Sequence, residues 1–364
     1  MTTQRLRQLF DEQGQSPWID NLKRSLITSG GLRSLIDDGV RGLTSNPTIF
    51  QKAIQDSVDY DQQYFELRRQ GMTTVDTYWA LVRQDIRDAA DCFADLYRQS
   101  DGGDGYVSVE VDPSLAHDSP GTLAAARHLW SDFDRPNLMV KVPATMESLP
   151  VIRALIAEGC NVNVTLIFSL DRYQQVMKAY IAGLNDRLAA GHDLSHVASV
   201  ASFFISRVDS EVDARLESLG TESARSLLGQ AAVAQGCLAY ELFQQTFSGE
   251  QWDRIAAAGG NVQRPLWAST STKNPNYPDT LYVDSLIGPQ SVNTLPDATV
   301  AAFADHGTVS RTVDRDLTTM HRLWSDLAQV GIDMNEVSQK LEKEGLASFT
   351  ASFVDLLAAL DSKV

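Results

Sequence analysis

The sequence has few cysteines and no long apolar run. Its 364 residues include only Cys92, Cys160 and Cys237, which are widely spaced and lie outside any CxxC pattern. This excludes a disulfide framework and predicts reduced thiols packed in a core. No stretch of about 18 consecutive apolar residues occurs, which excludes a transmembrane helix. The first residues form no apolar segment of the secretory kind, so we expect no signal peptide and a cytoplasmic location.

Positive charge is also scarce. The chain carries 31 Lys and Arg against 47 Asp and Glu, which gives a net charge of −16. An acidic chain without a run of basic residues is poorly suited to bind the phosphate backbone of a nucleic acid. We therefore expect no nucleic-acid partner and no membrane partner. A phosphorylated small molecule would need a local basic pocket.

Several common catalytic motifs are absent. The 6 histidines form no HExxH motif, and His192 and His196, four residues apart, lie in a segment typical of a loop. No GxSxG motif, Walker loop or CxxC pair occurs. The sequence therefore gives no sign of metal-dependent, nucleotide-binding or serine-hydrolase chemistry.

Short β-rich runs alternate with longer helix-period segments along the chain. The predicted strands are Pro17–Leu22, Gly42–Ser45, Tyr106–Val111, Leu138–Val142, Val162–Ile167, Val200–Ile205, Arg264–Ala268 and Leu281–Val283. The predicted helices include Thr74–Gln99, Thr122–Asp132, Ser148–Ala157, Leu170–Ala190, Thr221–Phe247 and Gln290–Ala304, and the tail from Asp314 predicts two more. This alternation predicts a mostly parallel sheet with helices packed outside it.

The number of predicted strands indicates a barrel. Eight strands within about 280 residues, followed by a helical tail, match the size of a (β/α)8 barrel. We therefore expect an α/β protein, a single (β/α)8 TIM barrel with additional C-terminal helices, in one domain over residues 1–364. A doubly wound open sheet is the alternative, but the Gly-rich dinucleotide turn of that fold is absent.

The predicted strands carry polar side chains on one face, which also favours the barrel. Strands buried on both faces in an open sheet read as continuous apolar runs, whereas here polar and apolar residues alternate with the period of a strand. The polar positions are Ser108, Glu110, Lys141, Asn161, Asn163, Thr165, Ser202 and Ser206. If these faces line one barrel, their side chains converge near the carboxyl ends of the strands, where barrel enzymes place catalysis.

One lysine stands apart from the others. Only Lys141 is embedded in an apolar strand, NLMVKVPAT. Burial favours the neutral amine, and a neutral amine attacks carbonyl carbon to form an iminium. The alternative is a structural ion pair with Glu110, and the sequence leaves both interpretations open. Glu110 in turn is either a general acid–base or the partner in that pair.

Three further polar residues follow predicted strands, and each has an ordinary structural alternative. Asp20 is a candidate proton carrier, but turns and N-caps use aspartate freely. Asn46 precedes a proline, and the pair is typical of a turn that starts a helix. Arg207 can hold a phosphate as a planar fork, or it can pair with Asp209 or Asp213 on the following helix.

Seven segments together resemble the transaldolase family over nearly the whole chain. They are SPWID, GLTSNPTIF, VSVEVDP, MVKVPAT, NVNVTLIFSL, ASFFISRVDSEVD and LWASTSTKNPNYPDTLYVDSLIGPQSVNTLPD, and they occur in the family's order. The chain is most similar to the bacterial branch of that family. The resemblance implies a (β/α)8 barrel that needs no cofactor and no metal.

The resemblance also implies an activity. A transaldolase transfers a dihydroxyacetone unit through a lysine Schiff base in the non-oxidative pentose phosphate pathway. The implied partners are sugar phosphates, with sedoheptulose 7-phosphate or fructose 6-phosphate as donor. The implied acceptor is glyceraldehyde 3-phosphate or erythrose 4-phosphate.

Individual residues match functional positions of the family. Lys141 matches the Schiff-base lysine, and Asp20 matches the aspartate that moves protons during carbon–carbon cleavage. Glu110 matches the glutamate that, with Thr165, positions the water used to form and hydrolyse the imine. The residues matching substrate-binding positions are Asn46 and Asn163 for hydroxyl groups of the dihydroxyacetone unit, Ser202 for the substrate and Arg207 for the phosphate.

One segment departs from the family's pattern. The better-known branch has a Ser-x-Arg motif after the seventh strand, whereas this chain reads ASTSTKN over residues 268–274. We expect Lys273, with help from Ser269 or Ser271, to supply the second positive charge for the phosphate, as a point charge rather than a planar fork.

Alternative functions stay open at this point. A fructose-6-phosphate-type aldolase that releases free dihydroxyacetone is the nearest one, and a sugar-phosphate-binding barrel without turnover is another. We expect a monomer or a homodimer. Trp324, Phe349 and Phe353 in the helical tail are expected to pack in the core, and the sequence does not say whether the tail covers the active site.

Overall fold

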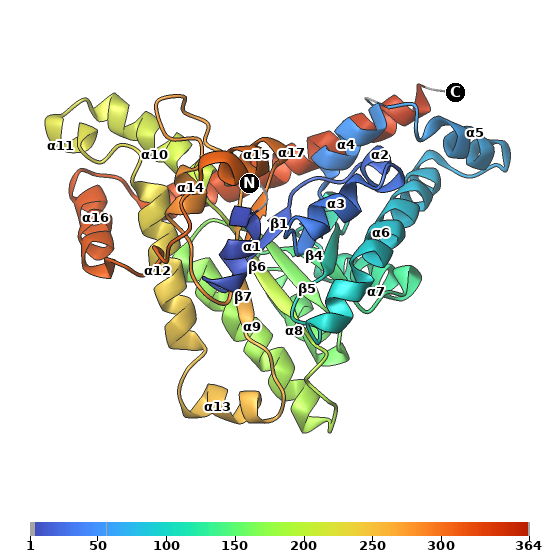
Figure 1. Ribbon diagram of the computed structural model, residues 1–364, viewed down its shortest axis with the longest axis horizontal. Coiled ribbons are helices and arrows are strands. Elements are labelled where there is room, and N and C mark those ends of the chain that lie inside the picture. Colours follow the sequence, from blue (N-terminus) through green and yellow to red (C-terminus); the bar gives the residue numbers. More distant parts are fainter. Residues whose placement is uncertain (1–3, 56, 363–364) are drawn as a thin grey trace.

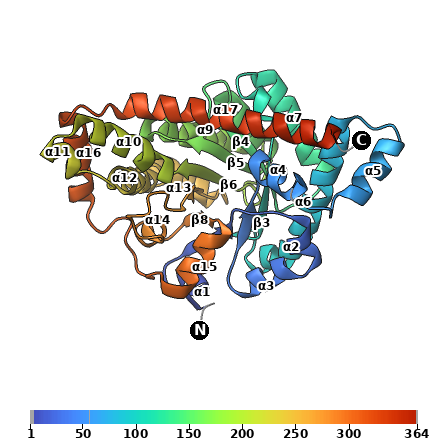
Figure 2. The same ribbon diagram turned by 90° about the horizontal axis from the view of Figure 1, so that it is seen from above.

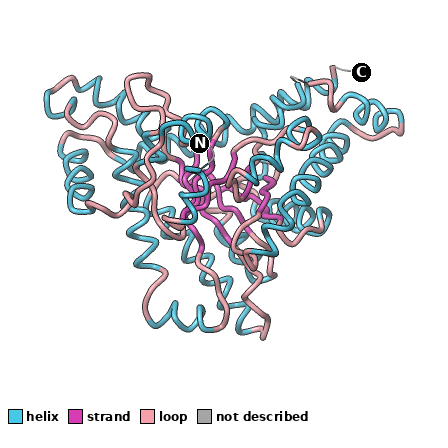
Figure 3. Tube along the Cα trace, viewed as in Figure 1, coloured by secondary structure: helices cyan, strands magenta, loops and turns pink. Residues whose placement is uncertain are grey.

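The centre of the molecule is a closed barrel of parallel strands, in a computed structural model that describes residues 4–55 and 57–362. The strands pair in chain order, and β1 pairs with β8 to close the barrel. They are β1 Gln15–Ile19, β2 Gly42–Thr44, β3 Tyr106–Glu110, β4 Leu138–Pro143, β5 Val162–Ile167, β6 Ser199–Phe204, β7 Gln263–Ala268 and β8 Ser291–Leu295. Figure 3 shows them as a central group surrounded by helices. The predicted (β/α)8 barrel is confirmed, and the doubly wound alternative is wrong.

Helices cover the outside of the barrel (Figure 1). From the N-terminus to β5 they are α1 Gln4–Asp11, α2 Arg24–Thr28, α3 Gly31–Asp37, α4 Pro47–Gln55, α5 Asp61–Arg69, α6 Thr74–Gln99, the 3₁₀ turn η1 Pro113–Leu115, α7 Ser119–Phe133 and α8 Leu149–Glu158. After β5 they are α9 Leu170–Ala189, α10 Ser206–Leu219, α11 Glu222–Arg225, α12 Ala231–Thr246, α13 Glu250–Ala257, α14 Leu281–Asp284, α15 Asp297–His306, α16 Leu317–Gln329 and α17 Met334–Asp361.

The helical tail forms the two predicted additional helices, and the second of them crosses the molecule. α17 is 28 residues long and contacts α4, α6, α10 and β5. Figure 2 shows it running across nearly the full width of the molecule, alongside α4. Because α4 follows β2 and α10 follows β6, these contacts place α17 over the carboxyl ends of the strands.

The eighth strand was predicted in the wrong place. The run Leu281–Val283 belongs to α14, and β8 lies instead at the start of the predicted helix Gln290–Ala304. Pro296 interrupts that predicted helix because it has no N–H to donate, and α15 begins after it. In α14, Tyr282 donates a hydrogen bond to Asp209 of α10 at 2.8 Å. This tertiary contact overrides the strand preference of a short apolar run.

The predicted helix Thr221–Phe247 is two helices, α11 and α12. Gly229 between them has φ of 70°, a left-handed conformation that suits glycine. A Cβ atom at this position would lie 2.7 Å from the Tyr277 ring, so the break is set by close packing. The backbone N–H of Gly229 donates to Asp213 at 2.9 Å, which fixes the turn.

A buried ion cluster closes the barrel at the amino ends of its strands. Asp104, 1% exposed, accepts hydrogen bonds from Ser16 at 2.7 Å and from Trp18 at 3.3 Å. It also forms ion pairs with Arg41 at 2.7 Å and with Arg264 at 3.2 Å. Every oxygen of this buried carboxylate therefore has partners, as a buried charge requires.

The structure bears on two expectations from the composition, one about the cysteines and one about membrane-spanning helices. Cys92, Cys160 and Cys237 are free, and Cys160 and Cys237 are buried, so the predicted core packing of these two thiols is confirmed. Within the described ranges, no helix is both long and apolar enough to cross a membrane.

Candidate active site

A cavity of about 400 Å³ lies at the carboxyl ends of the strands. Its walls come from the ends of β1, β2, β4, β6, β7 and β8 and from α4 and α17. The predicted site residues that line it are Asp20, Asn46, Lys141, Ser202, Arg207, Ser269 and Lys273. The other predicted residues, Glu110, Asn163 and Thr165, are buried beside it. The structure thus brings the whole predicted set to one end of the barrel.

Lys141 is the buried lysine that the sequence singled out. It is 4% exposed, and its Nζ lies 3.4 Å from Oε2 of Glu110 and donates to the backbone oxygen of Ser45 at 3.2 Å. The register of β3 and β4 places Glu110 and Lys141 side by side. The ion pair that the sequence offered as an alternative is therefore present. It is compatible with a nucleophile, because Lys141 also faces the cavity.

Two carboxyl groups near this amine have raised affinity for a proton. Burial raises the pKa of Glu110, and the charge of Lys141 opposes the rise. Burial also raises the pKa of Asp20, against the opposing effects of Lys141 and of a hydrogen bond from Thr44. Oγ1 of Thr44 donates to Asp20 at 2.7 Å. The site therefore holds two acids suited to taking up and releasing protons next to an amine.

A short chain of hydrogen bonds fixes the amide of Asn163. Oγ of Ser202 donates to Oδ1 of Asn163 at 2.7 Å, and Nδ2 of Asn163 donates to Oγ of Ser108 at 3.0 Å. Asn163 lies next to Lys141 in the register of β4 and β5. Side chains from β3 and β6 therefore hold the amide of β5 in a single orientation beside the lysine of β4.

An irregularity in β5 sits at Thr165. The register between β5 and β6 shifts between Val164 and Ile167, and Leu166 has φ of 60°. A bulky side chain in this left-handed region costs energy, and such strain is concentrated at functional sites. Oγ1 of Thr165 is buried and makes no hydrogen bond within the described part of the chain, and the same is true of Oε2 of Glu110. The bulge therefore supports a threonine hydroxyl that is free to bind a ligand.

Asn46 has the structural role that the sequence offered as its alternative. Its Oδ1 accepts a hydrogen bond from the backbone N–H of Ile49 at 3.0 Å, so it caps the first turn of α4 after Pro47. The residue also lines the cavity. The turn thus positions Asn46 at the site, and the two interpretations are compatible.

The structural alternative for Arg207 is wrong. The carboxylate of Asp209 binds Tyr282, and that of Asp213 accepts a hydrogen bond from Tyr277 at 2.7 Å. Neither carboxylate pairs with Arg207 in the described structure. The guanidinium group lines the cavity instead, and burial lowers its pKa.

Lys273 lies at the same end of the cavity as Arg207. Its Nζ donates to Oγ of Ser271 at 2.7 Å, and both residues line the cavity together with Ser269. Ser269 has φ of 55°, which marks a second strained position at this site. Burial lowers the pKa of Lys273, and the positive charges of Arg207 and Lys52 lower it further. The segment that departs from the family's pattern therefore does place a cation beside Arg207.

Some residues of the cavity gave no signal in the sequence. They are Thr44, Lys52, Thr294, Ser348 and Phe349. Phe349 belongs to α17 and packs in the core as expected, and its ring centroid also lies 5.9 Å from Nζ of Lys141. Its position depends on how α17 crosses the barrel, and helical periodicity carries no such information.

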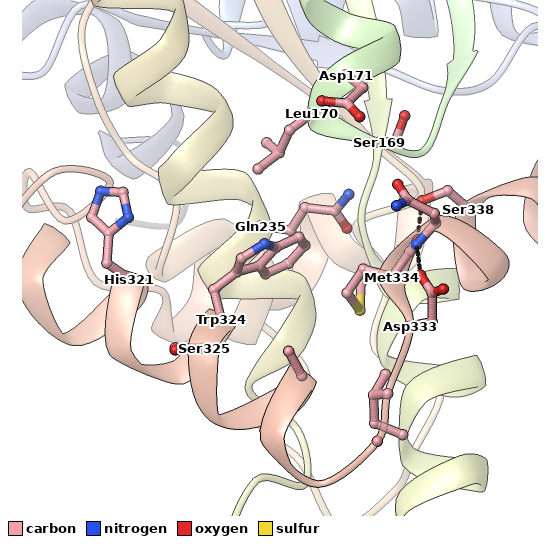
Figure 4. Close-up of a pocket in the computed structure, with 14 residues that line it drawn as sticks. Ser169, Leu170, Asp171, Gln235, His321, Trp324, Ser325, Asp333, Met334 and Ser338 are labelled. Atoms are coloured by element: carbon pink, nitrogen blue, oxygen red, sulfur yellow. Dashed lines mark hydrogen bonds between the residues drawn. The ribbon is translucent and has the colours of Figure 1, made fainter.

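The other two aromatic residues of the tail do not line the candidate cavity. Phe353 packs edge-on against Tyr78 at 5.3 Å between ring centroids, as expected of a core residue. Trp324 lines a larger cavity of about 660 Å³ between α9, α12, α16 and the start of α17, where it lies next to Gln235 (Figure 4). That cavity is lined by none of the predicted site residues. Its size alone therefore does not make it the candidate site.

The fold and the site together define a class of protein, the (β/α)8 barrels that carry a buried lysine beside carboxyl groups at the carboxyl ends of their strands. Residues 17–360 match the family described as Transaldolase/Fructose-6-phosphate aldolase. The chain belongs to this family, and the resemblance seen in the sequence is confirmed.

Individual relatives match over almost their full length. A transaldolase of Saccharopolyspora erythraea is 49% identical, with 98% of this chain and 97% of that protein covered. Transaldolase 1 of Streptomyces coelicolor is 48% identical, with 98% and 95% covered. A transaldolase of Mycolicibacterium smegmatis is 47% identical, with 96% and 95% covered.

Proposed function

We propose that this chain is a transaldolase that moves a dihydroxyacetone unit between sugar phosphates through a Schiff base on Lys141. The donor is sedoheptulose 7-phosphate or fructose 6-phosphate, and the acceptor is glyceraldehyde 3-phosphate or erythrose 4-phosphate. The observation that carries the proposal is the buried amine of Lys141, 3.4 Å from Glu110, in a cavity that it shares with Asp20 and Arg207. Full-length relatives that are named transaldolase favour transfer over simple cleavage.

The first step joins the donor to the protein. Nζ of Lys141 adds to the C2 ketone of the donor and gives a carbinolamine. Loss of water from C2 then gives the iminium, and Glu110 supplies the proton that leaves with the hydroxyl group. Oγ1 of Thr165 has no hydrogen-bond partner in the described chain, and Oε2 of Glu110 has only its ion pair with Lys141, which supports a role for both in holding that water. Their burial favours proton transfer within the site rather than with bulk solvent.

The second step breaks the bond between C3 and C4. Asp20 takes the proton of the C4 hydroxyl, the C4 oxygen becomes an aldehyde, and the bonding electrons move into the iminium to give an enamine. The raised pKa of Asp20 suits it to hold that proton. The aldose phosphate then leaves, and the three-carbon enamine stays bound to Lys141.

The third step transfers the retained unit. C3 of the enamine attacks the aldehyde of the acceptor, Asp20 returns its proton to the new alkoxide, and hydrolysis of the iminium frees Lys141. In this proposal Asn46, Asn163 and Ser202 hold the hydroxyl groups of the three-carbon unit. Arg207 and Lys273, which line the same cavity, bind the phosphate.

Borohydride trapping tests this proposal. Wild-type protein is incubated with fructose 6-phosphate and reduced, and the adduct is located by peptide mass spectrometry. We expect a reduced three-carbon adduct on Lys141, and addition of erythrose 4-phosphate before the reduction should discharge it as sedoheptulose 7-phosphate. Steady release of dihydroxyacetone without an acceptor would identify the aldolase alternative. No adduct on any lysine of the folded protein would rule out the Schiff-base mechanism.

The cellular setting is part of the same proposal. We propose that the protein acts in the cytoplasm, as a monomer or a homodimer. The free thiols of Cys92, Cys160 and Cys237 support a reducing compartment.

A further inference from the structure

Lys52 lines the candidate active site and has no role in the function described so far. It lies in the last turn of α4, the helix that starts directly after β2. Its side chain lines the same cavity as Arg207 and Lys273, which come from α10 and from the loop after β7. Three separate segments of the chain therefore each bring one cation to this space.

These three cations lie close enough to repel one another. The charges of Arg207 and Lys52 both lower the pKa of Lys273. Within the described structure, no carboxylate forms an ion pair with any of the three, and Asp20 is the only acidic residue that lines the cavity. The charge of Glu344 acts on Arg207 without forming an ion pair with it in the described structure. In a chain with net charge −16, three cations gathered around one cavity with a single acidic residue in its lining favour an anion.

The neighbouring cavity has a different charge balance. It has a volume of about 520 Å³ and shares Lys52 with the active site, and its other lysine is Lys23. Two carboxylates, Asp20 and Asp297, also line it and offset the two lysines. Lys52 therefore stands between a space with excess positive charge and a space without it, and an anion is favoured on the side of Arg207.

We propose that Lys52 is a third phosphate-binding residue of the active site. This inference rests on the proposed function, because it concerns the phosphate group of the same sugar substrates. Arg207 offers a planar fork, whereas Lys52 of α4 and Lys273 of the loop after β7 offer point charges. Together they take the place of the second arginine that the sequence lacks.

The test compares acceptors that differ only in the phosphate group. Erythrose 4-phosphate and erythrose are offered to the wild type and to Lys52→Ala, with fructose 6-phosphate as the common donor at saturation. We expect kcat/KM for erythrose 4-phosphate to fall by about two- to fivefold, mostly through KM, the upper part of the range for an exposed charge pair. The value for erythrose should stay at that of the wild type. The penalty should also shrink as salt is added, because Lys52 is exposed.

Two matched variants remove the same charge elsewhere. Lys178→Ala acts on an exposed lysine of α9 that donates only to Gln174 at 3.2 Å, and Lys23→Ala acts on the neighbouring cavity. Both should keep the wild-type preference for the phosphorylated acceptor. If Lys52→Ala behaves like Lys178→Ala, or if Lys23→Ala causes the larger loss, the assignment of Lys52 is wrong.

The wild type separates this inference from the proposed function. Adduct formation on Lys141 and transfer to erythrose 4-phosphate by the wild type establish the function whatever Lys52 does. If the wild type forms no adduct, the proposed function and the assignment of Lys52 both fail. If it forms the adduct but Lys52→Ala shows no phosphate-specific loss, only the assignment of Lys52 fails.

Discussion

The two ends of the barrel differ in how completely their buried charged groups are hydrogen-bonded. At the amino ends, both oxygens of Asp104 accept hydrogen bonds, from Ser16, Trp18, Arg41 and Arg264. At the carboxyl ends, Oγ1 of Thr165 is buried without a hydrogen-bond partner in the described chain, and Oε2 of Glu110 has only its ion pair with Lys141. The first arrangement is complete without a ligand, whereas the second has capacity for one.

This contrast indicates that the Asp104 cluster at one end of the barrel stabilises the fold, whereas the residues around Lys141 at the other end carry out the chemistry. A fully partnered buried network holds its members in one geometry. Polar groups left without partners cost free energy, and proteins retain that cost mainly at functional sites. We therefore expect substitutions at the amino ends to change stability and those at the carboxyl ends to change activity. The predictions below test this division in order of decreasing effect.

The largest effect is expected for Lys141→Met. Methionine keeps the length and apolar character of the buried stem but removes the amine. Because the proposed reaction has no other nucleophile, transfer should fall by at least about 10⁴-fold, and the borohydride adduct should disappear. The measurement is kcat/KM together with mass spectrometry of the trapped protein, and Lys178→Met is the control. An adduct on a different lysine of the variant would contradict the assignment.

Glu110→Gln should lower activity far more than it changes stability. Loss of the acid–base group predicts a decrease in kcat of about 10²–10⁴-fold. Because burial raises the pKa of Glu110, the folded protein binds the proton more tightly than the unfolded chain does. Stability therefore falls as pH rises through that raised pKa, and the neutral amide escapes this cost. The same change leaves Lys141 without its partner charge, which opposes that gain. Urea unfolding at neutral pH should show a smaller loss for this variant than for Asp104→Ala, and an equal or larger loss would contradict the contrast between the two ends.

Asp104→Ala should have the opposite profile. It leaves the partly buried Arg41 and Arg264 without their partner, which predicts a loss of about 3 kcal/mol of unfolding free energy, the lower end of the range for a broken buried pair. Activity per folded molecule should match the wild type, because the cluster lies at the far end of the barrel. The measurements are urea unfolding and kcat normalised to folded protein, and Asp104→Asn is the milder variant if Asp104→Ala does not fold. Unchanged stability with reduced kcat would overturn the division.

Asp209 tests whether burial of a carboxylate affects the free energy of unfolding even when the carboxylate has hydrogen-bond partners. It lies at the carboxyl ends yet has partners, because Tyr282 and the backbone N–H of Ala232 donate to it at 2.8 and 2.7 Å. Burial raises its pKa from 3.8 to about 6. Since the folded state holds the proton more tightly, stability should fall by about 3 kcal/mol as pH rises from about 4 to about 6.

Asp209→Asn should remove this fall. The measurement is the free energy of unfolding of wild type and variant across that pH range. The control is Asp186→Asn, where the wild-type aspartate has a lowered pKa because of Arg153 and thus a slope of opposite sign. If wild type and Asp209→Asn show parallel pH profiles, the aspartate does not titrate in this range.

The sequence predicts the site better than it predicts the eighth strand, for a physical reason. Glu110, Lys141, Asn163 and Ser202 are found by strand alternation, because one face of each strand must point into the barrel. The strand predicted around Tyr282 is wrong because that run is held in a helix by a contact with α10. The local sequence pattern around Tyr282 does not show that Asp209 of α10 would be its hydrogen-bond partner.

The same limit explains the residues that the sequence missed. Phe349 and Lys52 lie on helices, and each reaches the cavity only through the way α17 and α4 lie on the barrel. Their sequence spacing is that of any amphipathic helix. The family resemblance assigns roles to residues at the strand ends, because segments such as MVKVPAT are distinctive there. It assigns no role to Lys273, because the chain departs from the family's pattern in that segment.

The smallest effect is expected for a surface pair with equally good geometry. Arg153 and Asp186 form two hydrogen bonds, at 2.6 and 2.9 Å, but their side chains are 54% and 40% exposed. Water screens such a pair, so Arg153→Ala should change the unfolding free energy far less than Asp104→Ala, and still less in about 1 M salt. Urea unfolding of both variants at low and high salt measures this. If the two losses were equal, short distances rather than burial would set the strength of the Asp104 cluster, and the comparison between the two ends would lose its physical basis.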